Sequence, residues 1–140
     1  MSDEDYFGPQ SRYVKELLPS HFDPMKPWML KTEGATNIRK CGSATGSGMV
    51  MFYAPWCGHC KALAPAWEEA GKLSGFCDFY AFNCEKHKNH LLEIKEDKPD
   101  LVNSYPTIVY YRNGEPVGSY EGERGSQSLL KFCMSKCEGK

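Results

Sequence analysis

The sequence feature that most restricts the fold is a pair of cysteines, Cys57 and Cys60, set between a buried strand and a helix. Residues 49–54 are all apolar, which is typical of a short strand covered on both sides. Residues 61–73 carry apolar side chains at helical spacing, and Pro65 among them should kink this helix rather than end it. The two cysteines therefore lie in a turn at the start of a helix.

Other segments repeat this alternation of strand and helix. Asn113 and Gly114 are turn residues that favour a hairpin between the last two strands. The alternation predicts an α/β fold with a central mixed β-sheet flanked by helices on both faces. The remaining predicted strands are 77–82, 107–111, 117–120 and a candidate edge strand at 13–18, and the remaining predicted helices are parts of 22–40, 87–96 and 126–136.

Composition indicates one soluble globular domain. The chain has 140 residues, of which 41% are hydrophobic and 25% are charged. We expect residues 1–12 to be an arm and residues 13–140 to be a single domain, with a flexible glycine- and serine-rich loop at 42–48. A net charge of -1 gives no electrostatic reason to expect nucleic acid or an anionic membrane as a partner. No apolar run is long enough to span a bilayer, and we expect a monomer.

The two ends of the chain bear on its compartment. The N-terminus has acidic residues where a secretory signal would have basic ones, and the C-terminus is not an ER-retention tetrapeptide. As written, the chain is expected to stay in the compartment where it is made, which predicts the cytoplasm. Seven cysteines are an odd number, so at least one lies outside any intramolecular pair.

The position of Cys57 predicts redox chemistry. At a helix N-terminus, free N–H groups and the positive end of the helix dipole stabilise a thiolate. Cys57 is therefore expected to be the attacking sulfur, and Cys60, one turn further on, the resolving sulfur. His59, which follows Gly58 between them, favours the thiolate further. Stabilising the reduced form favours a donor or shuffler of disulfides over a reductant.

A structural zinc site is the main alternative for the cysteine pair. Zinc would need a second pair, and Cys133 with Cys137 is a candidate. That pair ends the chain whereas the first pair opens a helix, so we predict no metal site. His87 and His90 are predicted to lie on a solvated helix face. The remaining cysteines, which are expected to be packing residues or free thiols rather than redox centres, are Cys41, Cys77, Cys84, Cys133 and Cys137.

Residues 51–65, MFYAPWCGHCKALAP, resemble the catalytic domain of protein disulfide isomerases within the thioredoxin superfamily. The similarity continues through 104–108, 111–114 and 120–124 and covers residues 48–137. It implies a thioredoxin fold, a redox-active disulfide between Cys57 and Cys60, and oxidation or isomerisation of protein disulfides without a cofactor. The implied partners are client proteins with thiols or disulfides and a redox partner, in the ER or another oxidising compartment.

The resemblance also implies roles for individual residues. Pro106 matches the family's cis-proline, which lies beside the cysteines and, with Tyr105, helps to hold the substrate chain. Trp56 adjoins Cys57 and is expected to face the substrate. Arg124 matches a mobile arginine that approaches the resolving cysteine, although an ordinary surface arginine is the alternative.

Two departures from the family pattern stand out. Relatives usually carry a buried carboxylate where this chain has Met51, and its lysine partner falls at Ala81. Residues 95–100 look like a surface insertion. Two other functions stay open: a cytosolic disulfide reductase of thioredoxin type, and a redox-silent module that binds client chains. An intact cysteine pair favours an enzyme over the binding module.

Overall fold

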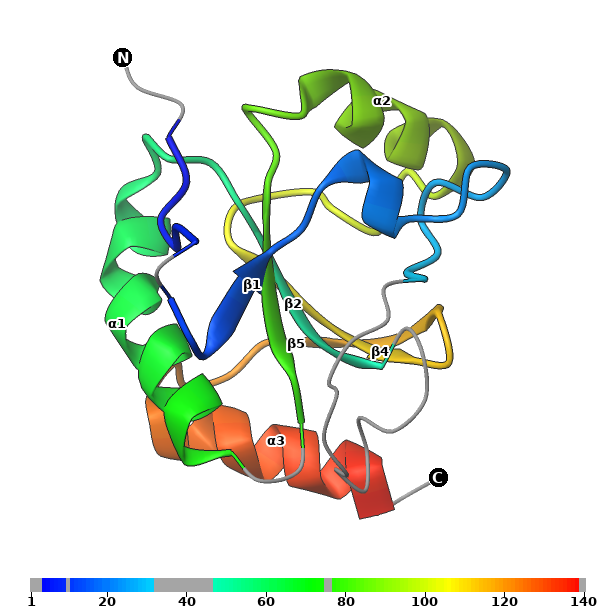
Figure 1. The fold of residues 1–140 in the computed structure, drawn as a ribbon. Helices are drawn as coiled ribbons and strands as arrows, with labels where there is room; N and C mark the ends of the chain where they lie inside the picture. The colour runs from blue at the N-terminus through cyan, green and yellow to red at the C-terminus, as the bar shows by residue number, and fades with distance from the viewer. Residues whose placement is uncertain (1–3, 10, 32–46, 75–76, 139–140) are drawn as a thin grey trace.

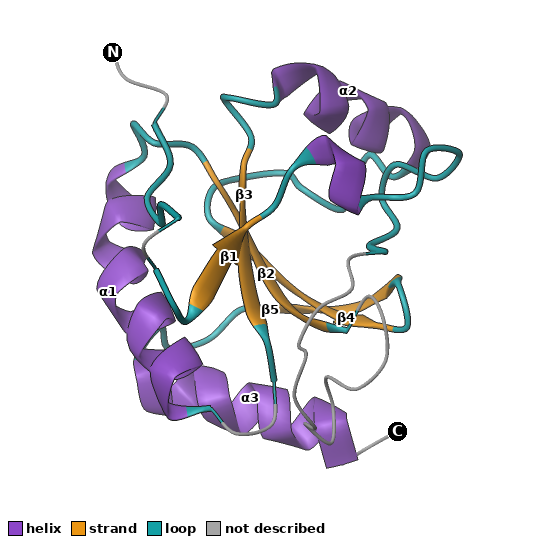
Figure 2. Cartoon of the chain, viewed as in Figure 1, coloured by secondary structure: helices purple, strands orange, loops and turns teal. Residues whose placement is uncertain are grey.

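The structure, a computed structural model, describes residues 4–9, 11–31, 47–74 and 77–138. Its centre is a five-stranded sheet in the order β1-β3-β2-β4-β5, in which β1, β3 and β2 are parallel and β4 and β5 are antiparallel to their neighbours (Figure 2). The predicted mixed sheet is therefore confirmed. The strands are β1 (Val14–Glu16), β2 (Gly48–Tyr53), β3 (Phe79–Asn83), β4 (Thr107–Arg112) and β5 (Glu115–Tyr120).

Helices cover both faces of the sheet (Figure 1). Helices α1 (Gly58–Leu73) and α3 (Ser126–Glu138) share one apolar core with the sheet, and α2 (Lys88–Asp97) shares a second core on the other face. A short 3-10 helix, η1 (Pro19–His21), follows β1. The two-faced architecture explains why the central strands are apolar along their whole length.

Strand β2 shows this directly, because all its residues are buried. Met49, Met51 and Tyr53 belong to the core under α1 and α3, whereas Val50 and Phe52 belong to the core under α2. Side chains alternate between the faces of a sheet, so both sets must be apolar. Of the predicted loop at 42–48, residues 42–46 lie outside the described residues, and Gly48 is the first residue of β2.

The helix predicted within 22–40 is confined to the residues after Pro24 and Pro27, and the part of it that can be compared, residues 28–31, is not helical. Residues 22–31 contain no helix, and Phe22 pairs with Leu30 in an antiparallel bridge. Pro24 and Pro27 cannot donate backbone hydrogen bonds, which disfavours a helix there. Both bridge residues are buried, so the segment packs as a loop on the α2 side. Residues 32–40 lie outside the described residues.

The prediction of free thiols at Cys77 and Cys133 is also wrong, because the structure joins them in a disulfide. Their Cα atoms are 6.6 Å apart, and both residues are buried in the core under α1 and α3. The bond links the segment just before β3 to helix α3. Cys133 is therefore not a thiolate that could bind zinc with Cys137. Cys84 is a buried free thiol, as predicted, and Cys41 lies outside the described residues.

Candidate active site

The cysteine turn begins helix α1. Cys57 is the N-cap residue, and its Sγ accepts a hydrogen bond from the N–H of Cys60 at 3.2 Å. The free N–H groups of the first helical turn and the helix dipole favour negative charge at this sulfur. Both cysteines are free thiols. Cys57 retains 8% exposure while Cys60 has none, so of the two residues only Cys57 reaches the surface.

Cys60 is held in its protonated form. Burial and, after it, a hydrogen bond with Cys57 raise the pKa of the Cys60 thiol to about 12, although a backbone hydrogen bond with Ala54 opposes them. A protonated, buried thiol is a poor nucleophile until its proton leaves. The two cysteines therefore differ in accessibility: Cys57 reaches the surface, whereas Cys60 is fully buried and protonated.

The segment before β4 lies against Cys57. The Tyr105–Pro106 peptide bond is cis, and the carbonyl oxygen of Tyr105 is 3.5 Å from the Sγ of Cys57. Pro106 is buried and Tyr105 is half-buried. Strand β4 is antiparallel to β2, so the start of β4 and the end of β2 lie side by side at the same end of the sheet. The sheet topology thus brings residues 105–106 to the cysteine turn.

Trp56 lies on the surface beside this junction. Its side chain is 49% exposed, its Nε1–H donates to Glu85 Oε1 at 3.2 Å, and its ring meets the Tyr105 ring edge-on with centroids 6.0 Å apart. Gly58 and His59 are exposed in the first turn of α1. An aromatic surface therefore borders the accessible sulfur.

Arg124 lies near Pro106, but no hydrogen bond or ion pair among the described residues joins it to Cys60 or to the rest of the cysteine turn. It is exposed between β5 and α3 and, with Pro106 and Thr107, lines a cavity of about 420 Å³. The structure therefore brings together Trp56, Cys57, Cys60, Tyr105 and Pro106, and leaves Arg124 at the side of this group.

A buried carboxyl group near the site was not predicted. Glu16 Oε2 accepts hydrogen bonds from the Tyr53 hydroxyl at 2.6 Å and from the Phe7 N–H at 3.0 Å. Burial raises the pKa of Glu16 to about 8, although both hydrogen bonds oppose this shift. Glu16 pairs with Ala81 across the sheet, and Ala81 pairs with Met51. Glu16 of β1 thus lies in the same cross-strand row as Met51 and Ala81, the two positions where relatives usually carry the buried carboxylate and its lysine partner. The sequence offered no signal for it beyond a glutamate in a candidate edge strand.

Within the described ranges, no three histidine, cysteine, aspartate or glutamate side chains converge in a group that could hold a metal ion. Over the same part of the chain, no helix combines the length and apolar character that crossing a bilayer requires.

Comparison with known proteins identifies the family. The family model for thioredoxin matches residues 33–135. The chain belongs to the thioredoxin family. Within that family it is a domain similar to protein disulfide isomerases: it is 34% identical over 124 residues to protein disulfide-isomerase like 2-2 of Arabidopsis thaliana, covering 88% of this chain and 23% of that protein. It is 40% identical over 92 residues to the protein disulfide-isomerase of Humicola insolens, covering 60% of this chain and 16% of that protein.

Solved structures agree on the fold of this thioredoxin-family domain. The J-Trx1 fragment of ERdj5 superposes with a TM-score of 0.64 at 28% identity, over 91% of this chain and 53% of that one. The Trx4 domain of ERdj5 superposes with a TM-score of 0.62 at 18% identity, over 91% of this chain and 98% of that one, which supports the fold alone. The chain spans about a fifth of the length of the curated relatives it matches.

Proposed function

We propose that this thioredoxin-family domain is a thiol–disulfide oxidoreductase that oxidises and isomerises protein disulfides through Cys57 and Cys60. The observation that carries the proposal is the setting of Cys57. Cys57 is the more accessible residue of the pair at 8% exposure, and its sulfur caps α1 through the Cys60 N–H at 3.2 Å and lies 3.5 Å from the Tyr105 carbonyl. The similarity to protein disulfide isomerases supports the same reaction class.

Isomerisation starts from the dithiol. The Cys57 thiolate attacks one sulfur of a client disulfide, the client S–S bond breaks, and the second client sulfur leaves as a thiolate that takes up a proton. The mixed disulfide at Cys57 is then attacked either by another client thiolate, which completes a rearrangement, or by Cys60. In the second case Cys60 loses its proton, the client leaves as a dithiol, and Cys57 and Cys60 form a disulfide.

Oxidation runs the same bonds in reverse. A client dithiol transfers two electrons and two protons to the Cys57–Cys60 disulfide, and the client becomes the disulfide. Regenerating the disulfide then requires an oxidant, which we assign to a partner with a disulfide of its own. No organic cofactor enters either direction. Trp56, Tyr105 and Pro106 are proposed to contact the client chain.

We place this activity in an oxidising compartment. The buried Cys77–Cys133 disulfide supports this, because such bonds persist where thiols are not kept reduced. Residues 13–140, with Phe7 of the arm packed into the same core, are proposed to act as one domain, as a monomer.

The reduction potential of the Cys57–Cys60 pair tests the proposal, measured in glutathione buffers. A value near roughly -180 mV would agree with oxidation and isomerisation. A value near roughly -270 mV would replace the proposal with a reductant of thioredoxin type. Recovery of a scrambled disulfide client should be abolished in Cys57→Ala and retained in Cys84→Ala, which removes a buried thiol outside the pair. If the wild type proves inactive and the Cys57→Ala variant still binds clients, the domain is a binding module instead.

A further inference from the structure

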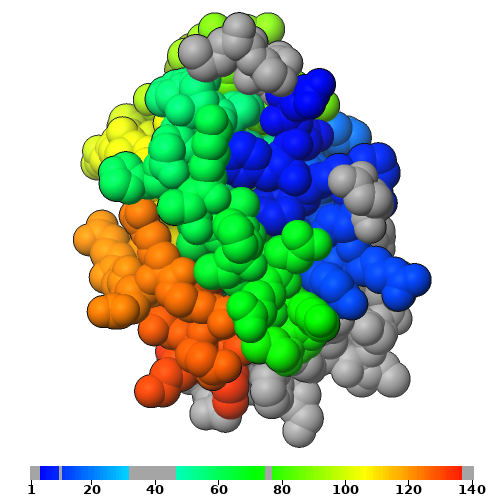
Figure 3. All heavy atoms as spheres, turned by 90° about the vertical axis from the view of Figure 1, so that its left-hand side faces the viewer, coloured from blue at the N-terminus to red at the C-terminus, as the bar shows by residue number. Residues whose placement is uncertain are grey.

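The N-terminal arm packs against the active site instead of lying free. Phe7 is only 3% exposed and belongs to the core under α1 and α3. The ring of Tyr6 stacks on that of Tyr53, with centroids 4.3 Å apart and an interplanar angle of 20°. Figure 3 shows the arm beside the segment that leads into α1. The arm is therefore part of the surroundings of the cysteine turn.

The hydroxyl of Tyr6 is directed at the backbone of that turn. It lies 3.2 Å from the carbonyl oxygen of Ala54, 3.0 Å from that of Pro55 and 3.4 Å from that of Cys57. Burial raises the pKa of Tyr6, and the charges of Cys60 and Cys57 raise it further. The phenol accordingly keeps its proton and acts as a donor to the backbone of the cysteine turn.

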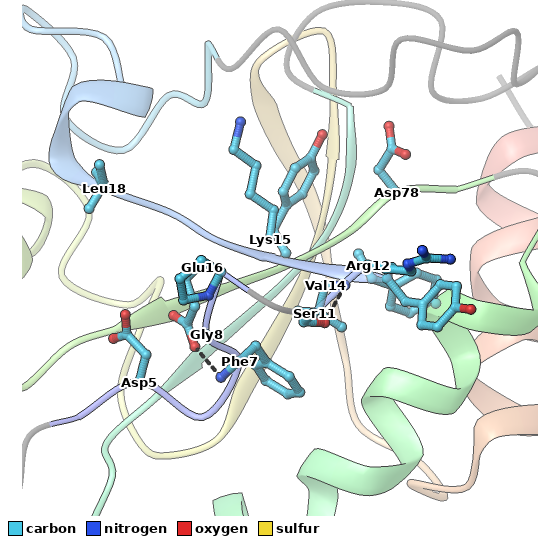
Figure 4. A pocket seen from close by; sticks show the side chains of 15 residues that line it. Asp5, Phe7, Gly8, Ser11, Arg12, Val14, Lys15, Glu16, Leu18 and Asp78 are labelled. Atoms are coloured by element: carbon cyan, nitrogen blue, oxygen red, sulfur yellow. Dashed lines mark hydrogen bonds between the residues drawn. The ribbon is translucent and has the colours of Figure 1, made fainter.

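Glu16 and Tyr53 anchor Tyr6 in this position. The N–H of Tyr6 donates to the Tyr53 hydroxyl at 3.0 Å, and that hydroxyl donates to Glu16. The next residue, Phe7, donates its N–H to the same carboxyl group (Figure 4). The preceding residue, Asp5, accepts a hydrogen bond from Asn83 Nδ2 at 3.1 Å and forms an ion pair with Lys86 at 3.3 Å. Three successive arm residues are thus fixed to β1, β2 and the end of β3.

We propose that Tyr6 is a positioning residue of the active site, whose hydroxyl holds the turn at residues 54–57 so that Cys57 caps α1. This inference rests on the proposed function of the cysteine pair. The structure has this cap in the dithiol, where the Cys57 sulfur accepts the Cys60 N–H while both thiols are free, and a thiolate accepts such a hydrogen bond more strongly than a neutral disulfide sulfur does. A contact that holds this geometry stabilises the dithiol relative to the disulfide. Tyr6 therefore makes the Cys57–Cys60 disulfide a stronger oxidant.

The substitution Tyr6→Phe isolates the hydroxyl, because phenylalanine can keep the stack on Tyr53. We expect the glutathione equilibrium to shift about fivefold towards the enzyme disulfide, the size of one typical hydrogen bond. A fivefold shift in a two-electron couple corresponds to about 20 mV towards a more reducing potential. Tyr6→Leu, which also removes the stacked ring, should shift the equilibrium at least as far.

The matched control is Tyr111→Phe. The Tyr111 hydroxyl also donates to a carbonyl, that of Trp28 at 3.0 Å, but Tyr111 belongs to the core under α2. Both variants should lose some thermal stability, and only Tyr6→Phe should change the glutathione equilibrium. If Tyr6→Phe matches the wild type within measurement error while the wild type exchanges disulfides, the role of Tyr6 is wrong and the proposed function stands. If the wild type does not exchange disulfides, the proposed function itself fails.

Discussion

At the residue scale, the unequal exposure of the two active-site sulfurs predicts unequal effects of their removal. Cys57→Ser should lower the rate of disulfide exchange at least a thousandfold, because the buried Cys60 cannot reach a client. Cys60→Ser should keep the first attack and accumulate a mixed disulfide, since the resolving sulfur is gone. Non-reducing electrophoresis with a client peptide would measure this. Equal trapping by both variants would contradict the assignment of Cys57 as the attacking sulfur.

Glu16 gives a second prediction at this scale. Its pKa rises from 4.5 to about 8 on folding, so it contributes stability below pH 4.5 that is lost as the pH rises through 8. Glu16→Gln cannot ionise. Its free energy of unfolding relative to wild type should therefore increase by on the order of 3 kcal/mol between pH 5 and pH 8.5.

Urea denaturation at the two pH values would measure the change. A constant difference between Glu16→Gln and the wild type at both values would show that the carboxyl is ionised throughout. The same experiment on Glu68→Gln offers a control, because Glu68 is a half-buried acid that accepts a hydrogen bond from Ser11 on the outer side of α1.

The residues of the site differ in how far the sequence could reveal them. Cys57 and Cys60 could be found because the apolar pattern of a strand ends just before them and the periodic pattern of a helix begins just after them. Their positions at the start of that helix also predict which sulfur attacks and which resolves. Tyr6 and Glu16 could not, because their contacts with β2 and the cysteine turn join positions 37 to 51 residues apart along the chain. Such contacts depend on how the arm and β1 dock, which no local pattern specifies.

At the element scale, helix α2 is docked more firmly than its charged sequence indicates. The solvated face predicted for His87 and His90 is wrong: the His87 ring stacks on Phe82, and the His90 ring contacts Phe22. The Nε2 of His90 lies 2.9 Å from the carbonyl oxygen of Pro27. Helix α2 thus contacts the loop at 22–31 through His90.

We therefore expect His90→Ala to loosen the loop at 22–31. The loss of the ring contact and the hydrogen bond should cost about 2 kcal/mol. Hydrogen exchange should accelerate in that loop more than at the cysteine turn. Burial lowers the pKa of His90, so the stability that it contributes is lost as the pH falls below 6.5, and the alanine variant should be less sensitive to acid. Uniform acceleration across the chain would contradict a local role.

At the scale of the whole molecule, the order of strands and helices could be predicted because apolar residues recur along each segment with the spacing of a strand or of a helix. The mixed sheet followed from the hairpin at Asn113 and Gly114 and from the buried run in β2. The Cys77–Cys133 disulfide could not be predicted, since 56 residues of chain separate its ends and neither cysteine lies in a motif. Its partners meet only after α3 has folded back beside α1.

This disulfide should contribute to stability without taking part in exchange. Closing a loop of this length restricts the unfolded chain by about 4 kcal/mol at most in the chain-entropy model. The double variant Cys77→Ser/Cys133→Ser should therefore lose about 3 kcal/mol, which lowers the Tm by roughly 10 °C in a domain of this size. The glutathione equilibrium of Cys57 and Cys60 should not change, because Cys57 follows the end of β2 whereas Cys77 precedes the start of the parallel strand β3, so the two pairs lie at opposite ends of the sheet. Cys84→Ser, which buries one hydroxyl but breaks no cross-link, is the control for placing a polar atom among apolar side chains. Calorimetry and the glutathione titration would together separate the roles: a shifted equilibrium in the double variant would show that the second disulfide is coupled to the active site.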